Sequence, residues 1–325
     1  MRKTSPGVSY LIAFFLLIAL NFLLPRLLPG DPLQAIYGEE ALIAMNPELK
    51  AEIIRRFSLD KTLSEQFTAY VSTLLRGDLG HSYYYNAPVS RMIVSFLPWT
   101  LLLVGLAVLV SNALGIVLGI ESGYRRGRLL DKTLITGLMF LSGFPDFFMG
   151  ILLLLFFGVA LGAMPLAGAV TPYAGKTGIS FVLDVLHHLL LPLLALALVR
   201  LTGSYLLTRN TMVTTLGEAF ILTARAKGCR ERVIRYRHAG KSSLLPVVTA
   251  TGLQLAHLVT GALFVEIIFS YPGVGSLLYN SLLTRDYPLM QGILLAVTAV
   301  ILVTNYLVDL LYARIDPRVL SGQQG

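Results

Sequence analysis

Six long apolar runs constrain the fold of this chain more than any other feature. They span residues 8–28, 98–120, 133–161, 185–208, 247–270 and 289–312. Each supplies about 20 mostly apolar residues, the length that a helix needs to cross a hydrocarbon core about 30 Å thick. A transmembrane β-barrel would show short alternating segments instead. With 55% hydrophobic and only 14% charged residues, the chain is predicted to be an all-α polytopic membrane protein with six transmembrane helices.

The distribution of basic residues predicts the orientation. Arg2 and Lys3 precede the first run, residues 125–132 between the second and third runs are rich in arginine, and a further basic cluster occupies residues 209–241. Loops enriched in Lys and Arg stay in the cytoplasm. We therefore expect both termini and these loops to be cytoplasmic. The net charge of +8 then reflects membrane topology and not nucleic-acid binding.

The first apolar run is predicted to be a retained helix. It is longer than the apolar region of a secretory signal peptide, which has about 7–15 residues, and no small-x-small cleavage site follows Leu24-Pro25-Arg26. Three parts are expected: a first transmembrane helix at residues 1–28, an extracytoplasmic loop at 29–97 and a five-helix core at 98–325. The core contains a cytoplasmic loop at residues 209–246.

The extracytoplasmic loop carries apolar residues at roughly helical spacing, namely Phe57, Leu63, Phe67, Tyr70, Val71 and Leu74. This spacing predicts one or two short amphipathic helices on the outer face. Such helices could lie at the lipid interface, bind a soluble partner, or pack as a lid on their own membrane domain.

The basic cytoplasmic loop at residues 218–246 is the strongest candidate for a binding surface. Small residues on a predicted helix are followed by a turn at glycine and by several arginines, a pattern that suits docking into a groove with electrostatic steering. The alternative is an amphipathic helix resting on anionic headgroups. We favour docking. The candidate residues are Glu218, Thr223, Ala224, Arg225, Ala226, Lys227, Gly228, Arg230 and Arg232.

The sequence offers no catalytic or metal-binding constellation. Residues 174–177 and 239–242 resemble a phosphate-binding loop, but Val170 and Arg235 stand where its first glycine is needed. The adjacent His187 and His188 would point about 100° apart on a helix, and Cys229 is the only cysteine. If ATP drives this protein, another chain is expected to hydrolyse it.

Ionisable residues within the apolar runs are candidates for a transport pathway. Burying such a group costs several kcal/mol without water or a partner. Asp146, Arg200 and Glu266 are therefore proposed as pathway or gate residues. Glu266 and Asp309 fit an anchoring role near the ends of their runs equally well. Interior glycines and prolines, including Gly119, Gly143 and Pro145, permit close helix packing and local breaks.

Seven motifs along nearly the whole chain carry a family resemblance. They are Leu28-Pro29-Gly30-Asp31-Pro32, Gly77-Asp78-Leu79-Gly80-His81-Ser82, residues 223–228, residues 238–246, Tyr271-Pro272-Gly273-Val274-Gly275, Arg285-Asp286-Tyr287-Pro288 and Asp316-Pro317-Arg318. In this order they resemble the permease subunits of ATP-binding-cassette importers of the dipeptide, oligopeptide and nickel class. Gly240-Lys241-Ser242-Ser243 departs from the family's usual Leu-Arg-Asn-Ala, which leaves open how the loop's final helix re-enters the membrane.

The resemblance implies a type I importer permease in a prokaryotic inner membrane that forms the pathway for di- or oligopeptides. It implies four kinds of partner: a second, homologous permease, two ATPase subunits, an extracytoplasmic solute-binding protein and the lipid bilayer. ATP and Mg would be used by the ATPases, and this chain would bind no cofactor. The segment from Ala224 to Arg232 would be a coupling helix that shifts the fourth and fifth spans.

Two alternatives stay open. A permease of the same family could import nickel or a metal chelate. A stand-alone secondary carrier belongs to a different class, and it predicts inverted repeats with broken helices, whereas no internal repeat is evident in the sequence.

Overall fold

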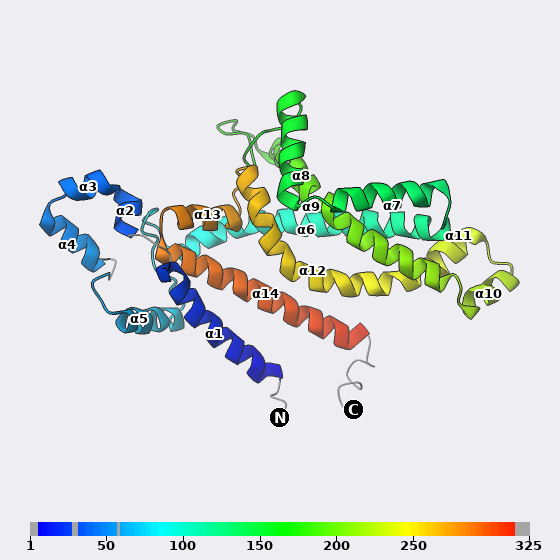
Figure 1. Cartoon of the computed structure of the whole chain (residues 1–325), viewed down its shortest axis with the longest axis horizontal. Helices are drawn as coiled ribbons and strands as arrows, with labels where there is room; N and C mark the ends of the chain where they lie inside the picture. The colour runs from blue at the N-terminus through cyan, green and yellow to red at the C-terminus, as the bar shows by residue number, and fades with distance from the viewer. Residues whose placement is uncertain (1–5, 28–31, 57–58, 316–325) are drawn as a thin grey trace. The chain divides into compact units, whose positions relative to one another are not determined.

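Every element in the described part of the chain is helical. The structure is a computed structural model and describes residues 6–27, 32–56 and 59–315 (Figure 1). The predicted all-α class is confirmed. The motif residues 28–31 and 316–318, together with Arg2, Lys3, Phe57 and Ser58, lie outside the described residues, as does the side chain of Asp309.

Five of the six predicted apolar runs each correspond to one long helix. These helices are α1 (Pro6–Leu27), α6 (Val89–Tyr124), α9 (Gly178–Thr215), α12 (Lys241–Ile268) and α14 (Tyr287–Ile315). Within the described residues, α6, α9 and the part of α14 from Tyr287 to Tyr306 are long and apolar enough to cross a membrane, and a bent pair of helices supplies a fourth candidate. Long apolar helices thus make up most of the fold.

The third predicted span, residues 133–161, is not one continuous helix in the structure. α7 (Leu129–Ser142) and the helical segment Asp146–Ala160 meet at 99°. Pro145 lacks a backbone N–H and disfavours helical geometry in the residue before it, so the helix stops there. The second segment comprises α8 (Asp146–Leu153) and a π-helical stretch, η1 (Leu154–Ala160).

The chain forms two compact units, residues 1–98 with 277–300, and residues 99–276 with 301–325. In the first unit α1 packs against α5 (Leu63–Leu75). The rings of Phe22 and Phe67 meet edge to face at 5.1 Å, and Arg26 Nε donates to Gln66 Oε1 at 3.0 Å. Asn21 Nδ2 donates to the Gln291 carbonyl at 2.9 Å, which ties α1 to α14.

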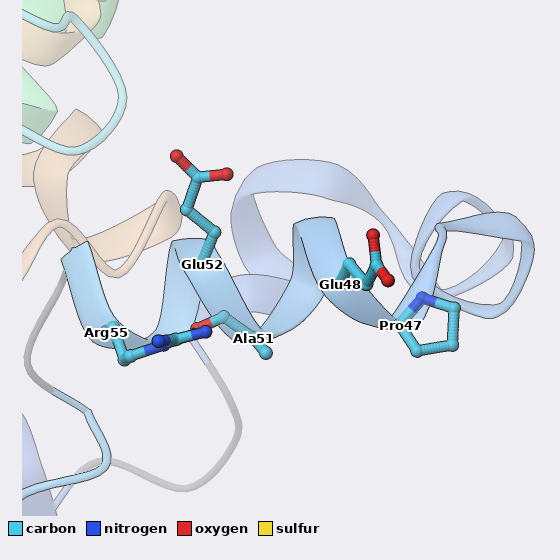
Figure 2. A pocket seen from close by; sticks show the side chains of 5 residues that line it. All are labelled: Pro47, Glu48, Ala51, Glu52 and Arg55. Carbon is cyan, nitrogen blue, oxygen red and sulfur yellow. The ribbon is translucent and has the colours of Figure 1, made fainter.

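The region predicted to hold one or two amphipathic helices contains four short helices among its described residues. They are α2 (Pro32–Tyr37), α3 (Glu39–Ala44), α4 (Pro47–Arg56) and α5. A capping box starts α5, because Thr62 and Glu65 exchange side-chain and backbone hydrogen bonds. A surface hollow on α4 is lined by Pro47, Glu48, Ala51, Glu52 and Arg55 (Figure 2). All five belong to one helix, so among the described residues no second element contributes to this hollow.

The second unit is built around α9, against which α7, α8 and α12 pack. Its main core gathers apolar residues of α6, α9 and the end of α12, including Leu103, Ala107, Leu189, Leu196, Val265 and Phe269. α6 and α9 approach closely through glycines. A Cβ on Gly115, Gly119 or Gly123 would lie only 2.6–2.8 Å from the Cβ atoms of Ser204, Thr208 and Met212.

Candidate functional site

The predicted coupling loop folds as a short helix, α10 (Ala219–Ala226), which lies with α11 (Glu231–Val233) at one end of the second unit (Figure 1). α10 ends as the sequence predicts. The Cys229 amide donates to the Ala224 carbonyl at 3.1 Å, and the Gly228 amide donates to the Arg225 carbonyl at 2.9 Å. These bonds form a Schellman turn, which needs a left-handed residue at Gly228, whose φ is +73°.

Chain re-entry after the turn is helical throughout. α11 passes into a π-helical segment, η2 (Ile234–Gly240), and then directly into α12. Gly240 has an ordinary helical φ of −61°, so the departure from the family motif at residues 240–243 causes no break. The small residue is needed for space, because a Cβ on Gly240 would lie 2.7 Å from the Arg235 carbonyl oxygen and 3.1 Å from Ile120 Cδ1 of α6.

The two faces of α10 differ in their environment. Ile221 and Ala224 are buried in a cluster with Ile120, Met212, Ile234 and Ala239. Two large apolar side chains on either side of this buried face are exposed, Phe220 at 45% and Leu222 at 60%. Ala224 therefore packs the loop onto its own unit, while Phe220 and Leu222 remain accessible on the two flanks of the helix.

Of the other predicted docking residues, Glu218, Thr223, Arg225, Ala226, Lys227, Arg230 and Arg232 are exposed. Glu218 is the N-cap of α10, and its carbonyl accepts from the Ile221 amide at 3.0 Å. Phe220 and Leu222 were not among the predicted residues. The sequence did indicate that some of them are exposed, because three consecutive apolar residues on a short surface helix cannot all face inward.

A network of charged and aromatic side chains joins the coupling loop to the end of α6. Arg235 Nη1 in η2 lies 2.9 Å and 3.1 Å from the two carboxylate oxygens of Glu121 in α6, and its guanidinium stacks 4.0 Å above the Tyr124 ring. Tyr124 donates to Glu231, and Glu231 also pairs with Arg225 of α10 at 3.5 Å. The Glu121 carboxylate accepts from Tyr236 and raises the pKa of that phenol. These residues are called the α6 clamp below.

A second, more buried ion pair lies at the start of α7. Arg209 of α9 donates to both oxygens of Asp131, at 2.6 Å and 2.8 Å, and Ser122 of α6 donates to the same carboxylate at 2.5 Å. The Gly127 amide adds a fourth hydrogen bond at 2.8 Å. This cluster joins α6, α7 and α9 without touching α10.

Two of the three pathway candidates come together, and the third does not join them. Asp146, the first residue of α8, pairs with Arg200 of α9 at 3.2 Å. Asp146 Oδ1 and Arg200 Nε are buried and have no hydrogen-bond partner among the described residues. The pair thus lies beside the 99° bend and keeps one acceptor and one donor unused.

Glu266 has a structural environment instead. It is fully buried in α12 and accepts from Thr100 Oγ1 at 2.6 Å and from the Gly275 and Ser276 amides at 2.7 Å and 3.1 Å. Glu266 therefore caps the first turn of α13 (Val274–Leu283). A Cβ on Gly273 or Gly275 would collide with its carboxylate, which explains the glycines of residues 271–275. This geometry favours packing over a gate.

Two further motifs bind each other within the first unit. The buried carboxylate of Asp286 accepts from Ser82 Oγ at 2.5 Å, from the Tyr84 amide at 3.1 Å and from the Leu289 amide at 3.2 Å. Asp286 thus starts α14 and also holds the turn that follows residues 77–82. Both motifs were predicted at loop boundaries, but no local pattern indicated that they meet.

The residues that resembled nucleotide or metal sites are engaged in local contacts. Lys176 Nζ pairs with Asp184 at 2.6 Å, and the same carboxylate accepts from the Thr171 amide and hydroxyl. The ring of His188 lies 2.9 Å from the Asp184 carbonyl. Among the described residues no group of three His, Cys, Asp or Glu side chains could hold a metal ion.

Comparisons with known proteins agree on one family. Residues 111–321 match the family model "Binding-protein-dependent transport system inner membrane component". The chain is 36% identical over 321 residues, 94% of each chain, to the di/tripeptide transport system permease DppB of Pseudomonas aeruginosa. It is 34% identical to the dipeptide permease DppB of Escherichia coli, covering 92% of this chain and 93% of that one. It is also 36% identical to the glutathione permease GsiC of Salmonella choleraesuis, covering 95% of both chains.

The resemblance inferred from the seven motifs is thereby confirmed over nearly the full length. Permeases of this family are multi-pass inner-membrane subunits that bind no cofactor, and ATP is hydrolysed by separate subunits of their systems. A stand-alone secondary carrier does not fit such a system. The chain belongs to the binding-protein-dependent transport system inner membrane components.

Proposed function

We propose that this chain is one of two homologous permease subunits of an ATP-driven importer, with six transmembrane helices and both termini in the cytoplasm. The described part of each predicted apolar run is mostly helical, the third run as two helices, and the basic loops at residues 125–132 and 209–241 face the same side in this arrangement. Two ATPase subunits bind on the cytoplasmic side, and a solute-binding protein delivers cargo on the other.

α10 is the element that engages an ATPase in this proposal. The observation that carries it is the exposure of Phe220 and Leu222 on the two flanks of α10, together with the exposed Arg225 and Lys227 near its end. Exposed apolar side chains flanked by charge are typical of a helix that docks into a groove. Ile221 and Ala224 hold the helix in place from the buried side.

The test replaces an exposed residue of α10. Leu222→Asp is expected to reduce co-purification of the ATPase subunits by about tenfold or more, because buried interface side chains commonly contribute about 1–2 kcal/mol or more. Membrane insertion and the level of the second permease should stay unchanged. Ala224→Glu is a poorer test, since Ala224 is buried and a glutamate there disrupts the loop itself. Normal ATPase binding by Leu222→Asp would overturn the docking role.

The proposed cargo is a short peptide. The names of the relatives specify di- and tripeptides, dipeptides and glutathione, which is itself a tripeptide. A nickel or metal-chelate importer is the second candidate, supported only by the breadth of the family. Competition of labelled dipeptide uptake by unlabelled dipeptides, glutathione and nickel in the reconstituted importer separates these cargos.

Asp146 and Arg200 are proposed to line the passage. An ion pair within an apolar helical region is costly unless it serves a pathway or a partner, and each member keeps an unused polar atom. Peptides carry charged termini that both side chains could contact. Asp146→Asn and Arg200→Gln are each expected to lower uptake severalfold while ATPase subunits still co-purify. Glu266, with its oxygens already occupied, is assigned to packing.

A further inference from the structure

The α6 clamp joins the coupling loop to a helix that is not its neighbour in sequence. α10 is connected through the chain to α9 on one side and through α11 and η2 to α12 on the other. Arg235 and Glu121, which are 114 residues apart in the chain, connect the loop also to α6. Movement of α10 can therefore reach three long helices, two along the backbone and one through side chains.

The geometry of the clamp suits the transmission of force. Both oxygens of Glu121 are within 3.1 Å of one guanidinium nitrogen of Arg235, and both side chains are about four-fifths buried. Arg235 is also held from the other side by the Tyr124 ring at 4.0 Å. Charge-assisted hydrogen bonds combined with ring stacking fix a guanidinium far better than a surface ion pair does.

The clamp continues as far as α10 itself. Tyr124 donates to Glu231, and Glu231 pairs with Arg225 of α10. Packing supports the same connection, because Ile120 of α6 contacts the cluster that contains Ile221, Ala224 and Ile234. Polar and apolar contacts thus both connect the end of α6 with α10, the polar ones at the exposed Arg225 and the apolar ones at its buried side.

We propose that Glu121 and Arg235 are positioning residues for transport: they make α6 move together with α10 when the ATPase subunits close. This proposal rests on the coupling role of α10 proposed above. Without the clamp, α10 still docks and still pulls on α9 and α12, but α6 lags behind. ATP is then hydrolysed with less cargo moved, since alternating access requires whole groups of helices to shift as rigid bodies.

Charge exchange is the decisive test, because only a direct pairwise interaction is recovered by it. The complete importer with its binding protein is reconstituted in liposomes, and labelled dipeptide uptake and ATP hydrolysis are measured together. Glu121→Arg and Arg235→Glu are each expected to lower the dipeptide moved per ATP about fivefold to tenfold, equivalent to a coupling energy of about 1–1.4 kcal/mol. The double exchange should recover most of this ratio, though not all of it, because a glutamate at position 235 cannot stack on Tyr124.

The chain supplies a matched control. Arg125 pairs with the same Glu121 carboxylate at 3.3 Å, but it directly follows the last residue of α6, one turn from Glu121, so it joins no two elements. Arg125→Ala is expected to leave the uptake per ATP within about twofold of wild type, as expected for a partly exposed i,i+4 pair. An equal loss in Arg125→Ala would show that removing any basic partner of Glu121 lowers the ratio, so that its bond to Arg235 has no special role, and would overturn the proposal.

Glu121→Gln is the milder variant should the reversed charges impair assembly. In the assembled importer, spin labels at Val117 of α6 and Arg237 of η2 report whether the two elements move together. In the wild type their separation should be the same with and without ATP, whereas in Glu121→Gln it should change when ATP binds. An unchanged separation in both, or an uptake per ATP that is no better in the double exchange than in the single variants, overturns the clamp. If no ATPase subunit co-purifies with the wild-type chain, the proposed coupling role of α10 is wrong instead.

Discussion

Gly228 is a single residue whose backbone conformation the turn after α10 requires. Its φ of +73° places it in the left-handed region, while a Cβ at this position would meet no atom within 4 Å. Only backbone conformation therefore selects glycine here. We expect the thermal stability of the purified complex to fall in the order glycine, Asn, Ala and Val at this position, because the left-handed conformation costs an ordinary residue about 1–2 kcal/mol and asparagine less. Equal melting temperatures for Gly228→Asn and Gly228→Val would contradict this order.

Substitution of Glu266 gives a second prediction about a single residue. Its carboxylate satisfies the Thr100 hydroxyl and two amides of α13 in a fully buried place. Glu266→Ala leaves these donors without a partner, at about 1–3 kcal/mol for each buried group. The variant is expected to lose thermal stability by several kcal/mol, whereas Glu266→Gln, which keeps one acceptor, should lose less. A gate residue would instead change uptake with no change in the melting temperature of the complex.

The contact between the helices α6 and α9 depends on glycine. Gly119 lies so close to α9 that an added Cβ would be 2.6 Å from Thr208 Cβ and 2.9 Å from the Tyr205 carbonyl oxygen, while Gly105 on the same helix has no neighbour within 4 Å. Gly119→Ala is expected to destabilise the complex by about 1–3 kcal/mol through overpacking. Gly105→Ala is the matched control and should be neutral or slightly stabilising, since alanine favours the helix. Thermal unfolding in detergent compares the two.

The long helices were predictable because apolar periodicity and length are local properties of a sequence. The same holds for the end of α10 at Gly228. The 99° bend after Ser142 was only partly predictable, since Pro145 signalled a break but not its angle. Contacts between distant residues were beyond the sequence. Nothing local to Glu121 indicates Arg235, and nothing local to Ser82 indicates Asp286.

Membrane orientation is the prediction for the whole molecule, and the single cysteine makes it easy to test. Cys229 follows α10 and is partly exposed, whereas Tyr173, in the segment between η1 and α9, is fully exposed. A membrane-impermeant maleimide should label Cys229 only in inside-out vesicles. In a Cys229→Ser background, Tyr173→Cys should be labelled only in right-side-out vesicles. Labelling of both sites from the same side would refute the proposed topology.

The carboxylate of Glu266 occupies the space where side chains at residues 273 and 275 would lie. The residues at positions 266, 273 and 275 must therefore come from the same parent protein, although they belong to two different helices and the turn between them. Chimeras between related permeases test this requirement. A crossover placed between residues 266 and 273 should yield a misfolded protein whenever the donor carries a larger residue at position 273 or 275, while a crossover before residue 266 or after residue 276 should be tolerated.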